Sequence, residues 1–137
     1  MIRTIVDTGP LVAYFNTRDR WHRWVVQQMT ALQPPLLTCE PVLTEASYLI
    51  HRAGGRPADL VRKLDQGVLE VAIDLEEEAA PIEALLRRYE DTPMSLADAC
   101  LVRLSERYAD CRIFTLDSDF EHYRRNARQV IPLLCPA

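Results

Sequence analysis

The segment IRTIVDTGPLVAYF, residues 2–15, sets the pattern that the rest of the chain repeats. Its opening IRTIV is rich in β-branched residues and has the length of a short buried strand, which ends at Asp7. Gly9 and Pro10 then turn the chain into an apolar helical segment, LVAYF. A strand followed at once by a helix indicates a βα unit, in which the strand pairs in parallel with the next one.

Strands and helices alternate along the whole chain. Further strands are expected at residues 36–39, 68–73, 111–116 and 129–134. Helices are expected at residues 11–15, 19–32, 41–53, 58–66, 76–89 and 95–108, with a brief helix at 120–125. This alternation predicts an α/β fold in one domain over residues 1–137, with a central, mainly parallel sheet of four to five strands flanked by helices.

The composition is that of an ordinary globular domain, with 48% apolar and 26% charged residues in a length of 137. No apolar run approaches the roughly 20 residues of a membrane span. The N-terminus also lacks the apolar core and cleavage site of a signal peptide, so we expect a cytoplasmic protein. The net charge of −4 argues against a broad nucleic-acid-binding surface but allows a local basic groove.

The cysteines have no C-x-x-C spacing, which leaves zinc and redox motifs unsupported. We expect them to be small buried apolar residues of a reduced protein.

Acidic residues follow two of the expected strands. Asp7 comes directly after the first strand, and Asp117 and Asp119 follow the fourth in TLDSDF. Parallel sheets carry their sites just beyond the carboxyl ends of the strands, so these acids are expected at one edge. Aspartate at a strand end is also ordinary turn chemistry, which is the alternative interpretation of each one alone.

Two helices add acids in apolar surroundings. Glu45 lies in PVLTEASYLI (residues 41–50), and Asp98 lies in MSLADACLVRL (residues 94–104). An ionised carboxylate on an apolar helix face is costly unless something compensates it. For Asp98 the alternative is structural, because Ser95 and Asp98 stand in the S-x-x-D relation of a capping box.

Several carboxylates in one cleft would raise one another's pKa unless a cation kept them ionised. Oxygen ligands without clustered Cys or His favour Mg²⁺, with Mn²⁺ as a substitute. Magnesium held by a few carboxylates is typical of phosphodiester hydrolysis.

The ordered set of motifs resembles the PIN-domain nucleases, in particular the VapC-type toxins of bacterial toxin–antitoxin pairs. It comprises a strand ending in D-T, an acid in the third helix, L-A-D-A-C-L, and TLDSDF after the fourth strand. The resemblance covers essentially the whole chain. It implies a PIN-like three-layer α/β/α sandwich, Mg²⁺-dependent endoribonuclease activity on RNA, a small antitoxin partner and a homodimer.

Carried over to this chain, the resemblance implies that Asp7 and Asp98 are the principal metal ligands. Glu45 and Asp117 would complete the metal-binding pocket, and Asp119 would be a further catalytic acid. The resemblance leaves open whether Asp117 or Asp119 fills the last place.

Two groups of arginines are candidates for contact with RNA phosphates. Arg18, Arg20 and Arg23 surround Trp21 and Trp24, and the second group is Arg124, Arg125 and Arg128. The alternatives are solvated faces for the arginines and core packing for the tryptophans.

Other enzymes fit less well. Asp7-Thr8-Gly9 matches the aspartic-protease triplet, but Pro10 and the many expected helices do not suit that β fold. A haloacid-dehalogenase phosphatase would need D-x-D there, and a receiver domain would need a suitably placed lysine. The serious alternative is a catalytically weak PIN-like module that binds RNA or a protein partner, and metal-dependent cleavage distinguishes the two.

Overall fold

Five short strands form a parallel sheet in the order β3-β2-β1-β4-β7. Their bounds in the computed structural model, which describes residues 1–137, are β1 Arg3–Val6, β2 Leu36–Thr38, β3 Leu69–Val71, β4 Cys111–Phe114 and β7 Leu133–Leu134. Strand β1 is central, and its Ile5 pairs with Leu37 of β2 and Ile113 of β4. All three side chains are fully buried, so the middle of the sheet is the middle of the core.

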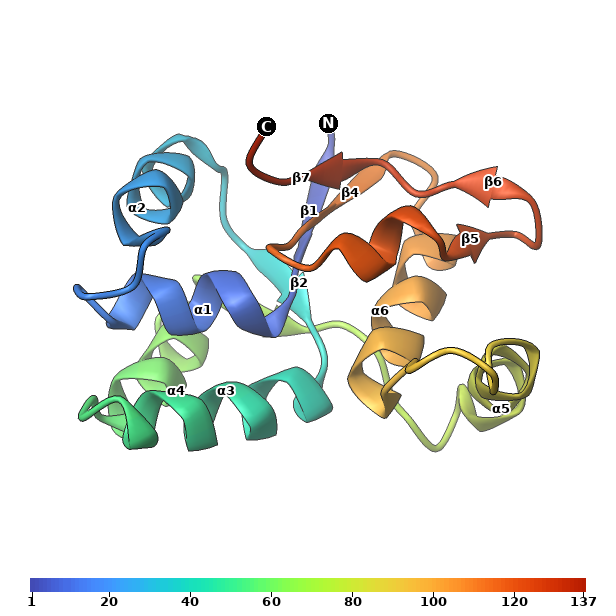
Figure 1. The fold of residues 1–137 in the computed structure, drawn as a ribbon, viewed down its shortest axis with the longest axis horizontal. Helices are drawn as coiled ribbons and strands as arrows, with labels where there is room; N and C mark the ends of the chain where they lie inside the picture. Colours follow the sequence, from blue (N-terminus) through green and yellow to red (C-terminus); the bar gives the residue numbers. More distant parts are fainter.

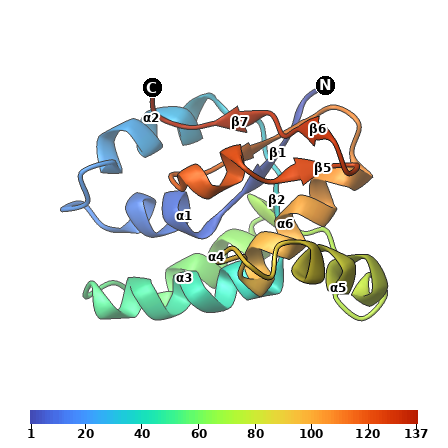
Figure 2. The same ribbon diagram turned by 45° about the vertical axis from the view of Figure 1, so that its right-hand side comes forward.

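Helices cover both sides of the sheet, which gives the three layers that the sequence predicted. In Figure 1, α1 to α4 lie on the left of β1, and α5 and α6 lie on its right. The bounds of these helices are α1 Thr8–Phe15, α2 His22–Ala31, α3 Glu40–Arg52, α4 Pro57–Asp65, α5 Ala79–Arg88 and α6 Leu96–Arg107. Figure 2 shows that α3 runs below α1. No helix has the length and apolar character needed to span a membrane.

The first helix starts earlier than predicted. It begins at Thr8, so Gly9 and Pro10 lie in its first turn, where proline is tolerated because no helical N–H is required. Gly9 also allows a close approach, since a Cβ there would lie 3.2 Å from the Cβ of Leu116. This packing brings the start of α1 against the loop that follows β4.

The acidic stretch before α5 is a turn, although the sequence suggested the start of a helix. Asp74 Oδ1 accepts hydrogen bonds from the backbone N–H groups of Glu76 and Glu77, and α5 begins only at Ala79. An Asx turn thus replaces the expected first helical turn.

The C-terminal region differs most from prediction. The expected helix at 120–125 is instead a 3₁₀ turn, η1 (Ser118–Glu121), followed by strand β5 (Arg124–Arg125). The expected strand at 129–134 is split by Pro132 into β6 (Gln129–Val130), paired antiparallel with β5, and β7 in the main sheet. The turn between β5 and β6 holds two consecutive non-glycine residues at positive φ, a conformation that the sequence pattern does not reveal.

Candidate active site

The carboxyl ends of β1 and β4 open into a cleft of about 620 Å³. All five acids selected from the sequence line it: Asp7, Glu45, Asp98, Asp117 and Asp119. They come from the end of β1, from α3, from α6 and from the loop after β4. Residues more than 100 positions apart in the sequence therefore face the same space, because parallel strands end at the same edge.

Asp7 is the most deeply buried of these acids, with 6% of its surface exposed. Its Oδ1 accepts a hydrogen bond from the backbone N–H of Thr8 at 2.7 Å, and its Oδ2 accepts one from the Thr115 hydroxyl at 2.8 Å. Burial raises its pKa to about 6, although both hydrogen bonds oppose the rise, and the charges of Asp98 and Asp117 add to it. Asp7 is thus a carboxylate that a nearby cation would stabilise strongly.

Asp98 caps helix α6 and also lines the cleft. The Ser95 hydroxyl accepts from the Asp98 N–H at 3.0 Å, and Asp98 Oδ2 accepts from the Ser95 N–H at 3.3 Å, so the capping box is confirmed. The same carboxylate faces the cleft. Burial raises its pKa, and hydrogen bonds from Ser95 and from the Tyr123 hydroxyl, at 3.0 Å, oppose the rise.

The loop after β4 is tied to Asp7 through one hydroxyl. Thr115 Oγ1, which donates to Asp7, also accepts a hydrogen bond from the Asp117 N–H at 2.9 Å. Asp117 Oδ1 in turn accepts from the Asp119 N–H at 2.9 Å. The charge of Asp117 helps to raise the pKa of both buried acids, Asp7 and Asp98, which favours Asp117 over Asp119 as the fourth acid of the group.

Glu45 differs from the buried acids because it is exposed on α3. Val42, one turn earlier, is buried, whereas Tyr48 and Leu49 are exposed to 58% and 37%. The apolar stripe on which the sequence placed Glu45 is therefore partly a surface feature, and this carboxylate is exposed to solvent.

Two residues of the site were missed by the sequence analysis: Tyr123, which contacts Asp98 from the core, and Asp19, which lines the cleft. Tyr123 is 2% exposed and packs edge-to-face against Phe120 and Tyr89, which aims its hydroxyl at Asp98. Nothing in the local pattern distinguishes this tyrosine from a core residue. Asp19 also lines the cleft, and its carboxylate accepts a hydrogen bond from the Trp21 N–H. In the sequence, an aspartate at this position indicates a turn and nothing more.

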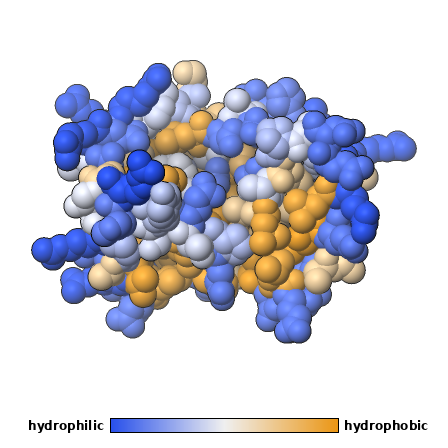
Figure 3. Space-filling model, turned by 60° about the horizontal axis from the view of Figure 1, so that its bottom comes forward, coloured by the Kyte–Doolittle hydropathy of each residue, from blue (hydrophilic) through white to orange (hydrophobic).

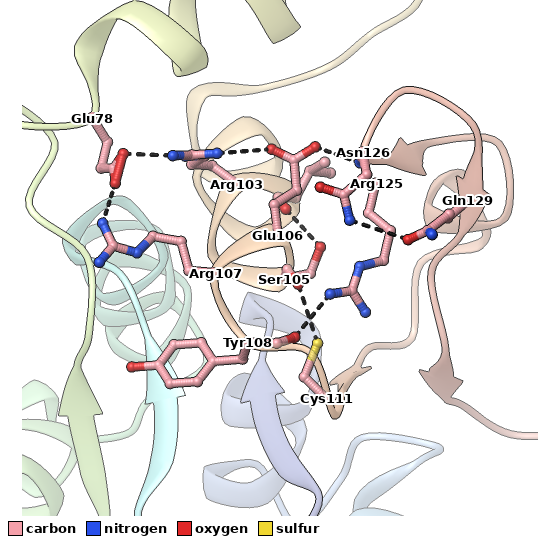
Figure 4. Close-up of polar contacts among 11 residues, drawn as sticks. Glu78, Arg103, Ser105, Glu106, Arg107, Tyr108, Cys111, Arg125, Asn126 and Gln129 are labelled. Atoms are coloured by element: carbon pink, nitrogen blue, oxygen red, sulfur yellow. Dashed lines mark hydrogen bonds and ion pairs between the residues drawn. The ribbon is translucent and has the colours of Figure 1, made fainter.

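Helix α6, which carries Asp98, is anchored at its other end by the ion pairs in Figure 4. The buried Glu78 accepts from Arg103 Nε at 3.1 Å and from Arg107, and these arginines lower the pKa of its carboxyl. Arg125 is also buried and donates to the Tyr108 carbonyl at 2.8 Å. This arginine of the second candidate RNA-binding group therefore serves the fold.

The donor chemistry of the cleft fits a hard divalent cation. All the candidate ligands are carboxylate oxygens, and the buried Thr8 hydroxyl beside Asp7 has no hydrogen-bond partner. As they stand, no three His, Cys, Asp or Glu side chains are close enough together to hold an ion.

A second, larger groove of about 1070 Å³ lies next to the cleft and shares Glu45 and Ser95 with it. It runs between α3, the segment 70–78 and α6. Apolar surface gathers on the face shown in Figure 3, and the exposed Leu75 and Leu96 border the groove. Its lining is better suited to another polypeptide than to phosphate chemistry.

Comparison with known proteins agrees with this fold. The model of the PIN domain family matches residues 4–126, and the chain belongs to that family. Ribonuclease VapC26 of Mycobacterium tuberculosis (strain ATCC 25618 / H37Rv) is 31% identical over 115 residues, which span 82% of this chain and 85% of VapC26. The sequence resemblance to VapC-type PIN nucleases is thereby confirmed, and these similarities support a nuclease.

A solved structure supports the fold independently. The crystal structure of Mycobacterium tuberculosis VapC20, described as a Sarcin-Ricin loop cleaving toxin, matches with a TM-score of 0.70 at 23% sequence identity. The match covers 87% of this chain and 93% of VapC20.

Proposed function

We propose that the protein is a Mg²⁺-dependent endoribonuclease and the toxin of a toxin–antitoxin pair. The observation that carries this proposal is the convergence of Asp7 and Asp98 on one cleft at the carboxyl edge of the sheet, both buried and both with a raised pKa. Two desolvated carboxylates that share a cleft with further acids are costly without a cation, so the site is built to bind one.

Each cleft residue has a task in this proposal. Asp7 and Asp98, together with Glu45 and Asp117, would hold Mg²⁺ or Mn²⁺, which supplies positive charge at the scissile phosphate and favours ionised water. Thr115 and Tyr123 orient the two buried carboxylates by donating hydrogen bonds.

Proton transfer falls to the more solvated acids. The exposed Glu45, or Asp117, accepts the proton of the attacking water. Hydrolysis then leaves 5′-phosphate and 3′-hydroxyl ends.

The test is cleavage of a mixed RNA pool by the purified protein with Mg²⁺, with Mn²⁺ and with EDTA. Asp98→Asn keeps an oxygen that can accept the capping-box hydrogen bond from Ser95, but it removes the negative charge of a metal ligand. Asp59→Asn, on the exposed surface of α4, is the matched control. We expect metal-dependent cleavage by the wild type and by Asp59→Asn, and none by Asp98→Asn. Equal cleavage by all three would place the active site elsewhere.

The alternative proposal is a PIN-like module that binds RNA or a protein but cleaves poorly. The exposed Glu45 and the absence of a preassembled group of three ligands favour it. Wild type that is inert at every metal concentration but retains RNA would support this alternative.

We also propose a homodimer and a small antitoxin as partners, on the basis of the family. The larger groove supports a polypeptide partner because apolar side chains and carboxylates line it together and because it shares Glu45 with the acid cleft. Light scattering of the protein alone tests the dimer. Leu96→Asp, which places a charge at the groove, should abolish capture of the antitoxin while metal-dependent cleavage remains.

A further inference from the structure

A third, smaller groove of about 310 Å³ opens from the acid cleft. The two share the segment 116–118 as a common wall. Beyond that wall the groove is bordered by Arg20, Trp21, Glu121, Leu133 and Pro136. The groove and the acid cleft therefore adjoin across this segment.

Trp21 is a fixed platform in the groove. Asp19 Oδ1 accepts its backbone N–H at 2.8 Å, which pins the loop before α2. Its ring meets that of Trp24 edge-to-face at 6.4 Å, and Trp24 meets Phe114, the fully buried last residue of β4, at 5.8 Å. The half-buried indole of Trp21 is thus supported, through Trp24, by a buried residue of β4, the strand that leads to Thr115 and the acids.

The face of this indole already holds a flat cationic group. The Arg20 guanidinium lies 4.6 Å from the ring centroid of Trp21, and Arg20 is exposed and forms no ion pair. Only the ring holds it there, so another planar group can take its place. The displaced guanidinium can then pair with a phosphate, for which its planar fork is suited.

The charges in the groove select a base over a phosphate. Asp117 and Glu121 border it, and two carboxylates repel a phosphate. The Glu121 carboxylate has no hydrogen-bond partner and can accept from the exocyclic amine that adenine, guanine and cytosine carry.

We propose that this groove binds one nucleobase of the RNA strand, stacked on Trp21, with Arg20 on the adjoining phosphate. The inference rests on the proposed function for the identity of the strand, and it deepens that function by adding a subsite next to the acids. Stacking on an aromatic ring tolerates any base, so the subsite would contribute chiefly to affinity and to the position of the strand.

The first test measures binding without catalysis. A fluorescein-labelled single-stranded RNA decamer of mixed sequence is titrated with protein in EDTA and followed by anisotropy. Trp21→Ala should raise the Kd by about 5- to 150-fold, which is the range for loss of one stacked base. Arg20→Gln should lower the slope of log Kd against log salt by about 1. Arg62→Gln, an exposed arginine on α4, is the matched control and should change neither.

A second pair of variants keeps the test decisive if Trp21→Ala fails to fold. Trp21→Leu retains apolar bulk without an aromatic face, and Trp21→Phe restores the face. We expect weak RNA binding by the leucine variant and recovery by the phenylalanine variant. Equal affinity of these two variants, or of Trp21→Ala and wild type, would overturn the subsite, as would no binding by the wild type.

Cleavage kinetics separate this inference from the proposed function. If the wild type cleaves, Trp21→Leu should raise KM with little change in kcat, and an unchanged KM would refute the subsite while the nuclease stands. If the wild type does not cleave but binding depends on Trp21, the subsite stands and the proposed catalysis fails.

Discussion

Replacement of Asp7 by asparagine should stabilise the metal-free protein while abolishing its activity. The carboxyl is buried, and its pKa rises from 3.8 to about 6 in the folded chain. The folded state therefore binds this proton more tightly than the unfolded chain does. The contribution of protonated Asp7 to the free energy of unfolding is fully present below pH 3.8 and is lost as the pH rises through about 6.

The magnitude follows from the size of that shift. A rise of this size lowers the free energy of unfolding by about 3 kcal/mol once the pH is high enough to ionise Asp7 in both the folded and the unfolded chain. The side chain of the Asp7→Asn variant carries no charge to desolvate, but it has one acceptor oxygen fewer for the donors Thr8 and Thr115, which costs about 1 kcal/mol. The net gain is about 2 kcal/mol, or roughly 8 °C in Tm for a chain of this length.

The assay is thermal unfolding in EDTA across the pH range, with wild type, Asp7→Asn and the exposed-site control Asp59→Asn. The gain of Asp7→Asn should be full above about pH 7. Well below pH 4, where the wild-type carboxyl is also neutral, it should turn into a deficit of about 1 kcal/mol, which is the cost of the lost acceptor. Added Mg²⁺ should raise the Tm of the wild type and of the control, but not that of Asp7→Asn. A variant that is no more stable than wild type in EDTA, or a difference that does not depend on pH, would refute the reasoning.

Three further substitutions test how the site is held. Tyr123→Phe removes a hydrogen bond that lowers the pKa of Asp98, so the acid limb of the cleavage pH profile should move to higher pH. The free energy of unfolding should fall by about 1.5 to 3 kcal/mol. Ser95→Ala removes the helix cap and should lower the free energy of unfolding by about 1 kcal/mol, measured in urea, with weaker Mg²⁺ binding by calorimetry. Glu78→Gln should destabilise the protein at neutral pH. Because folding lowers the pKa of Glu78, the deficit should disappear as the pH falls below 4.5, the ordinary pKa of a glutamate. Thermal melts across the pH range test this, and a deficit that does not change with pH would contradict it.

The order of elements from β1 to β4 and five of the six acids that line the cleft could be predicted from the sequence alone. β-branched runs such as IRTIV, followed by helical periodicity and bounded by proline and glycine, indicate βα units, and right-handed crossovers leave few ways to arrange them. Asp7 and Asp117 end two of these strands, so the parallel arrangement by itself places them at one edge. Local chemistry and topology were sufficient for these features.

The C-terminal region could not be predicted in the same way. Whether residues 129–134 form one strand depends on which neighbours offer hydrogen bonds, and β6 and β7 pair with different sheets. Short polar segments such as Arg124–Arg125 have little periodicity of their own, so tertiary contacts decide their conformation.

Burial and partners were also decided only by the tertiary structure. Glu45 and Asp98 both occur beside apolar residues in the sequence, yet Glu45 is exposed and Asp98 is buried against Tyr123, a residue 25 positions away. Desolvation and hydrogen bonding depend on atoms brought together from distant parts of the chain, and they set the pKa of each carboxyl. The sequence therefore predicted five of the acids that line the cleft but not Asp19, and only the packing around Asp7 and Asp98 raised the pKa of these two carboxyls.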